Sequence, residues 1–213
     1  MVRVQERNKA RPFSEKALQA LVLVFGIATL VVPPLVLATS GTATTVPSWS
    51  AARLLAMLAF TLIFMQIITG ATRRLLNRLF PPVLVQRVHV ATGLCGFILA
   101  LIHGVLVLAY SFQKGHSVVW VIGPVTLALL AVTVAAALER KRLGSTWRWI
   151  HRLNYLIFVA VFLKTVAIGT DFKTSAALRM IFYAYVAIAG LAFAYRLVEL
   201  ERMKRKVKGR KDR

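Results

Sequence analysis

The chain has 213 residues, of which 58% are hydrophobic and only 16% are charged. A soluble protein of this size would expose too much apolar surface, so the composition argues against a globular enzyme and for a membrane bundle. The net charge of +21 often indicates nucleic-acid binding, but the basic residues cluster in short segments between apolar stretches, so we expect no nucleic-acid partner. The single cysteine, Cys95, lies inside an apolar stretch, which argues against a disulfide framework or a zinc site.

Six apolar stretches follow one another along the chain. Each is about 20 residues long, the length that a helix needs to cross a hydrocarbon core of ~30 Å. The sequence therefore predicts an all-α membrane protein, a six-transmembrane-helix bundle in contact with lipid. The expected spans are 17–38, 52–71, 88–110, 118–138, 149–169 and 178–198.

Three parts are expected along the chain: a basic tail over 1–16, the six-helix domain over 17–198, and a second basic tail, frayed in structure, over 199–213. The first span has no small-residue cleavage site and exceeds the usual length of a signal peptide, so we expect it to be retained. Pro33 and Pro34 lie in its last third and predict a kink or an early end of that helix.

The basic residues alternate between the connections. The first tail has 5 Lys and Arg, the segments after the second and fourth spans have 4 each, and the C-terminal segment counted from Arg196 has 9, whereas the other three connections have 0, 1 and 2. By the positive-inside rule, both termini and the two Arg-rich connections are expected in the cytoplasm. The predicted location is the cell membrane, with the N- and C-termini on its inner side.

Two histidines occupy matching positions on the third and fifth spans. His89 and His151 each lie near the expected cytoplasmic end of a span that runs from inside to outside. Imidazoles at the same depth on parallel helices can ligate one haem iron from both sides, an arrangement suited to electron transfer. A lone histidine in a membrane helix often only contacts a neighbouring helix, but three of the four histidines lie in such spans, where ionisable groups are rare and usually functional.

The surroundings of this pair suit haem b. Arg87, Arg148 and Arg152 lie near the same level and are candidates to pair with propionates. On the third span, small residues lie between His89 and His103 on one helical face; they would let a flat cofactor approach the backbone, or simply allow close helix packing. These small residues are Gly93, Gly96 and Ala100.

A second, outer site is incomplete in the sequence. His103 lies ~21 Å beyond His89 by helical rise, and the matching positions on the fifth span are Lys164 and Thr165. Lys164 is either a ligand, which requires its neutral amine, or a cation that reaches toward the membrane interface. His103 is a candidate ligand, so the sequence allows either one haem or two. His116 lies in a connection and is expected to be solvated.

His89 and His103, fourteen residues apart, and His151 in the segment WRWIHRLNYL resemble the ligand pattern of the ferric reductase-like transmembrane domain family. Its relatives include ferric reductases, NADPH oxidases and the haem subunit of the periplasmic methionine sulfoxide reductase system. The resemblance covers residues 51–196 and implies six spans with paired histidines that hold stacked b-type haems. The fourth histidine position of the family falls on Lys164, and the sulfoxide reductase subunit uses the positions of His103, His151 and Lys164.

The resemblance implies a redox subunit without its own flavin and nicotinamide domain, since the chain has no GxGxxG motif. The expected function is electron transfer across the membrane, from a flavoprotein reductase or quinol on the cytoplasmic side, where a flavin or quinone would bind, to an acceptor protein outside. Metal ligation is assigned to His89, His151 and His103. Two other hypotheses stay open: a haem-free transport or scaffold bundle, and a sensory relative with one haem.

Overall fold

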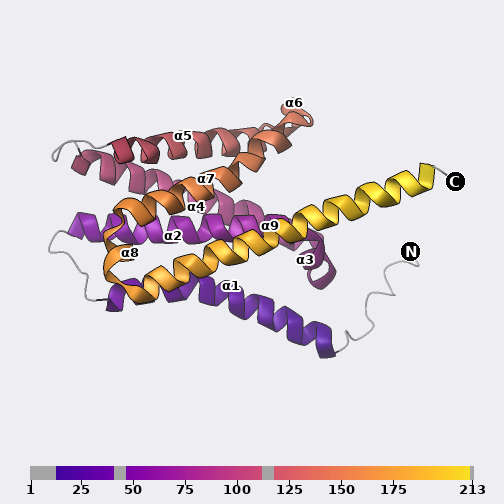
Figure 1. Ribbon diagram of the computed structural model, residues 1–213, viewed down its shortest axis with the longest axis horizontal. Helices are drawn as coiled ribbons and strands as arrows, with labels where there is room; N and C mark the ends of the chain where they lie inside the picture. The colour runs from indigo at the N-terminus through magenta and orange to yellow at the C-terminus, as the bar shows by residue number, and fades with distance from the viewer. Residues whose placement is uncertain (1–12, 41–46, 112–117, 212–213) are drawn as a thin grey trace.

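The computed structural model describes residues 13–40, 47–111 and 118–211, which are helical almost throughout and contain no strand (Figure 1). Six helices are long and three are short. The long ones are α1 (Phe13–Thr39), α2 (Pro47–Ala71), α4 (Pro82–Ser111), α5 (Val118–Leu138), α7 (Thr146–Ile168) and α9 (Ala176–Lys211). The short ones are α3 (Arg73–Leu79), α6 (Arg140–Leu143) and α8 (Thr170–Thr174).

Each long helix contains a stretch that is long and apolar enough to cross a membrane. The prediction of an all-α, six-span membrane protein is therefore confirmed, and the predicted spans match the helices closely. α1 begins and α9 ends at the same end of the bundle, where α3 and α6 also lie (Figure 1). The Arg-rich connections are thus gathered with the basic C-terminal segment at one end of the molecule.

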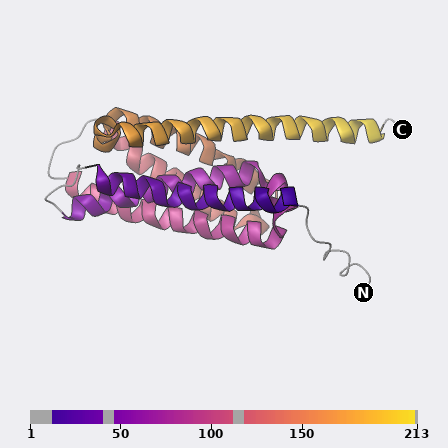
Figure 2. The ribbon, with the colours of Figure 1, turned by 90° about the horizontal axis from the view of Figure 1, so that it is seen from below.

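Two helices differ from the expected outline. α9 continues to Lys211 and projects well beyond the bundle (Figure 2), so the frayed tail expected from residue 199 is wrong within the described residues. The segment after Val198 is rich in Glu, Lys and Arg, which are good helix formers, and this explains the extension. α1 does not end early either, since it runs through Pro33 and Pro34 to Thr39.

α2 is the central helix of the bundle, with half of its membrane-length stretch buried. Phe60 stacks between two rings, Phe158 of α7 at 4.9 Å and Phe182 of α9 at 4.7 Å between ring centres. One turn further along α2, Phe64 stacks on Tyr185 of α9 at 4.2 Å. These aromatic contacts join α2, α7 and α9 into the apolar core of the protein.

The small residues of α4 pack against α2. A Cβ atom added to Gly96 would lie 3.1 Å from Cβ of Leu62, and one added to Gly93 would lie 3.1 Å from the amide of Gln66. The two helices therefore approach closely at these glycines, in agreement with the packing alternative for the small-residue face. α5 packs along α7 in a second helix pair, whereas α4 and α7 contact each other little.

Candidate functional site

His89 of α4 and His151 of α7 face each other between the two helix pairs. Their ring centres are 6.2 Å apart and their planes are inclined by 66°. Both residues are partly exposed rather than sealed in the core. The structure therefore brings together the two imidazoles that the sequence pairs by depth, although their helices are not packed tightly against each other.

The ring of His89 is held from α2. Its Nδ1 atom lies 2.9 Å from the hydroxyl oxygen of Thr69, and a Cβ added to the neighbouring Gly70 would lie 3.7 Å from Cε1 of the ring. The side-chain amide of Gln66 donates to the carbonyl oxygen of His89 at 2.6 Å and also to the hydroxyl of Thr92. α2 thus fixes both the backbone and the ring of this histidine.

His151 has its own polar neighbours on α5 and α7. Its Nδ1 atom lies 3.3 Å from the side-chain nitrogen of Asn154, one helical turn later. The oxygen of that amide accepts a hydrogen bond of 2.8 Å from the hydroxyl of Thr133 in α5. The Thr133 side chain is fully buried. The indole of Trp147 also packs near this ring, with 5.7 Å between ring centres. In both histidines Nδ1 therefore faces a polar protein group.

The pair fits the axial ligation of a haem better than it fits a metal ion held by the protein alone. Two imidazoles that bind one metal from opposite sides, with metal–nitrogen bonds of ~2.0 Å, have ring centres roughly 6 Å apart. The observed 6.2 Å agrees with that separation. Among the described residues, no group of three or more His, Cys, Asp or Glu side chains is placed to hold a metal ion, and a porphyrin would supply the four remaining ligands.

Four arginines lie near the pair, one by its charge and three by their positions in the chain. Arg73 of α3 is close enough to His89 for its charge to act on the ring. Arg152 is exposed and stacks over the ring of Trp149, with its guanidinium carbon 4.3 Å from the ring centre. Arg87 and Arg148 are exposed on α4 and α7, near the two histidines in the chain. The sequence analysis missed Arg73, which was counted only as a charge in a connection.

His103 and Lys164 lie together toward the other end of the bundle. Nδ1 of His103 lies 2.9 Å from the carbonyl oxygen of Ala52 in α2. A carbonyl only accepts, so this nitrogen carries the proton and Nε2 has the lone pair. Lys164 is within electrostatic reach of His103, and its ammonium lies against α5, where a Cβ added to Gly123 would be 2.5 Å from Nζ. His116 lies outside the described residues.

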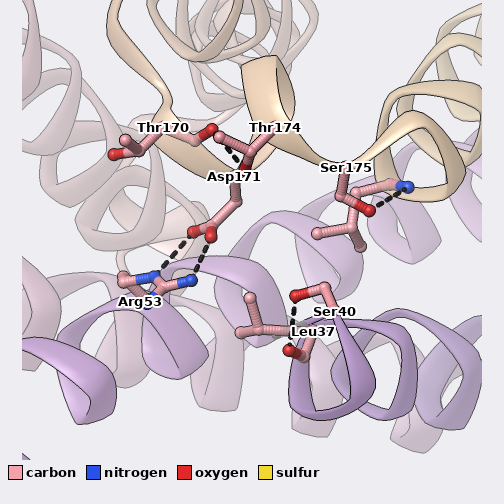
Figure 3. A network of polar contacts seen from close by, with 8 residues as sticks. Leu37, Ser40, Arg53, Thr170, Asp171, Thr174 and Ser175 are labelled. Carbon is pink, nitrogen blue, oxygen red and sulfur yellow. Dashed lines mark hydrogen bonds and ion pairs between the residues drawn. The ribbon is translucent and has the colours of Figure 1, made fainter. Parts of the chain in front are cut away.

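An ion pair closes the same end of the bundle. Arg53 of α2 forms a two-pronged contact with the carboxylate of Asp171 in α8, and the hydroxyl groups of Ser40, Thr174 and Ser175 make local helix-end contacts nearby (Figure 3). Arg53 follows Ala52 directly, so the same turn of α2 contacts both His103 and α8. The sequence analysis did not single out Arg53, because it assigned this residue to an apolar span. A lone cation inside such a span is rare and usually functional, and this could have drawn attention to it.

The polar side chains that hold the histidines were also missed. Gln66, Thr69, Thr133 and Asn154 are dispersed in apolar spans, and each has a plausible role in bonding within its own helix. Comparison with known proteins adds no assignment, since no family model and no curated protein sequence matches this chain. The function must therefore be argued from the geometry of these residues.

Proposed function

We propose that this protein is an integral-membrane haem b protein that transfers electrons across the membrane, a ferric reductase-like redox subunit. The observation that carries the proposal is the facing pair His89 and His151, whose ring centres are separated by the distance expected for two axial ligands. When bound, the haem would supply reversible one-electron chemistry. The resemblance in histidine spacing points to the same cofactor.

The chain's own residues would bind and orient this group. His89 and His151 would hold the iron, and their contacts with Thr69 and Asn154 restrain the two rings. Arg73, Arg87 and Arg152 are candidates to pair with the propionates at the basic end of the bundle. The apolar helices around the two histidines would keep the iron in a medium of low dielectric, while the arginines lie exposed at the basic end.

The basic end of the bundle is proposed to face the cytoplasm, with both termini on that side of the cell membrane. A flavoprotein reductase or a quinol would deliver electrons there, with a flavin or quinone bound at that side. An acceptor protein would take them at the opposite end. His103, with Lys164 nearby, is the candidate ligand of a second haem, which would shorten the transfer across the membrane.

The test is an absorption spectrum of the purified protein after expression with abundant haem, with pyridine haemochrome quantitation. We expect a low-spin b-type spectrum, and its loss in His89→Ala and in His151→Ala. His103→Ala is the matched control on α4, and it should retain the haem that the pair holds. A colourless wild-type protein would instead favour a haem-free transport or scaffold bundle, and a full spectrum in His151→Ala would overturn the ligand assignment.

A further inference from the structure

The hydroxyl group of Thr69 has only one proton to give, and α2 itself takes it. The hydroxyl donates to the carbonyl oxygen of Met65 at 2.8 Å, with the carbonyl of Gln66 at 3.3 Å as a second acceptor. Both partners are carbonyl oxygens, which can only accept. With its proton given to α2, the oxygen of Thr69 acts as the acceptor in the 2.9 Å contact with Nδ1 of His89, which then runs from the ring to the oxygen.

This direction determines the tautomer of His89. Nδ1 carries the proton and donates it to Thr69, so Nε2 has the lone pair that a metal requires. A hydrogen bond from the second ring nitrogen also fixes the rotation of the ring and raises the basicity of the ligand. Met65, Thr69 and His89 thus form a chain of hydrogen bonds with a single consistent direction.

The backbone of His89 is held at the same point. The amide of Gln66, one turn before Thr69 on α2, donates to the carbonyl oxygen of His89, and the close packing at Gly93 brings α4 against that amide. A ring held at Nδ1 on a backbone held at its carbonyl has little freedom to turn. α2 therefore positions the imidazole although it contributes no ligand itself.

The ring of His151 is held differently, since it also forms a hydrogen bond with the backbone of Thr133 in α5. Its neighbour at Nδ1 is the amide of Asn154, which can present either its nitrogen or its oxygen after a half-turn. Thr133, the other neighbour of that amide, can donate to the amide or to the carbonyl of Leu130. The Nδ1 side of His151 therefore faces an amide that can either donate or accept, whereas Nδ1 of His89 faces a hydroxyl oxygen whose proton is given to α2.

We propose that Thr69 is a positioning residue that holds His89 as its Nδ1–H tautomer and so presents Nε2 toward His151. The role of this tautomer in haem ligation rests on the proposed function. The tautomer itself is a property of the chain without any cofactor. The two can therefore be tested separately on the same protein.

The first experiment records nitrogen-15 NMR spectra of the histidines in the full-length, cofactor-free protein at alkaline pH, where imidazoles are neutral. The His89 signal is assigned by its loss in His89→Gln. Wild type should show the Nδ1–H form, and Thr69→Val, which keeps the side-chain shape, should convert it to the Nε2–H form or to a mixture. Thr69→Ser retains a hydroxyl and should restore the wild-type signal.

Thr72→Val is the matched control, because the Thr72 hydroxyl donates to the carbonyl of Ile68 in its own helix. It should leave the His89 signal unchanged. In the haem-loaded protein, Thr69→Val should weaken haem binding by roughly 10-fold or more and shift the midpoint potential upward, because a less basic ligand stabilises the oxidised iron less. Thr72→Val should change neither quantity.

The outcomes separate the two proposals. If wild type binds no haem, the proposed function fails, while the tautomer of His89 still decides the role of Thr69. If haem binds but Thr69→Val leaves both the tautomer and the midpoint potential unchanged, the positioning role of Thr69 is overturned and the ligand pair stands.

Discussion

The hydroxyl of Tyr185 in α9 donates a hydrogen bond of 2.9 Å to the carbonyl oxygen of Thr29 in α1. Thr29 lies four residues before Pro33, and proline has no N–H to donate to that carbonyl. A backbone group left without a partner in a membrane is costly. The tyrosine replaces the donor that Pro33 lacks, which helps α1 to continue through this proline.

The first prediction concerns this bond. Tyr185→Phe should lower the free energy of unfolding by about 1–3 kcal/mol, because the buried carbonyl of Thr29 loses its donor and Thr61 loses a hydrogen-bond partner. The ring stack with Phe64 is retained. In a Pro33→Ala background the N–H of residue 33 serves the carbonyl, so the same substitution should cost clearly less. Unfolding of the four proteins in detergent measures the difference, and equal costs in both backgrounds would refute the explanation.

The fold was predictable because hydrophobic length is a local property of the sequence. Six runs of about 20 apolar residues are enough to place six helices. The course of α1 was not predictable, because it depends on Tyr185, which lies 156 residues away from Thr29 in the chain. The helical extension of α9 was accessible from helix propensity, but a run of like charges suggested a solvated tail.

The histidine pair was predictable for a similar reason. His89 and His151 share a depth that follows from the direction and length of their spans, and the structure brings their rings together. The partners of these rings were not predictable, because Thr69 and Gln66 face α4 only through the particular rotation of α2. The role of Gly93 and Gly96 was decided in the same way, by which helix lies against them.

The second prediction tests the α2–α4 contact. Gly96→Leu should destabilise the protein by roughly 1–3 kcal/mol, because its side chain would enter the space of Leu62 and force the helices apart. Gly190→Leu is the matched control in α9, since a Cβ there meets no atom within 4 Å. Both substitutions raise helix propensity equally. Thermal unfolding in detergent should therefore show a loss for Gly96→Leu only, and equal effects would contradict the packing role.

The third prediction concerns the ion pair between Arg53 and Asp171. Their side chains are 11% and 20% exposed, so they are nearly removed from solvent. Asp171→Asn should cost about 3 kcal/mol, because it leaves the Arg53 cation without its carboxylate. The double variant Arg53→Met with Asp171→Leu should recover most of this loss, since apolar replacement removes both charges together.

Glu139→Gln provides the reference for this series. Glu139 pairs with Arg142 at 3.4 Å, but both side chains are more than half exposed. The free energy of unfolding of the Glu139→Gln protein should differ from that of wild type by less than ~0.5 kcal/mol. Chemical unfolding in mixed micelles would compare wild type with the three variants. A double variant as unstable as Asp171→Asn would contradict the prediction, because it would show that the ion pair stabilises the protein by more than cancelling its two charges.

The fourth prediction tests the orientation. Thr174 at the end of α8 and Ser145 between α6 and α7 are exposed and lie at opposite ends of the bundle. In a Cys95→Ala background, a cysteine placed by Thr174→Cys should react with a membrane-impermeant maleimide added outside intact cells. A cysteine placed by Ser145→Cys should react only after permeabilisation, because the Arg-rich end is expected inside. The reverse labelling pattern would show the opposite orientation in the membrane, and the proposed direction of electron flow would then be wrong.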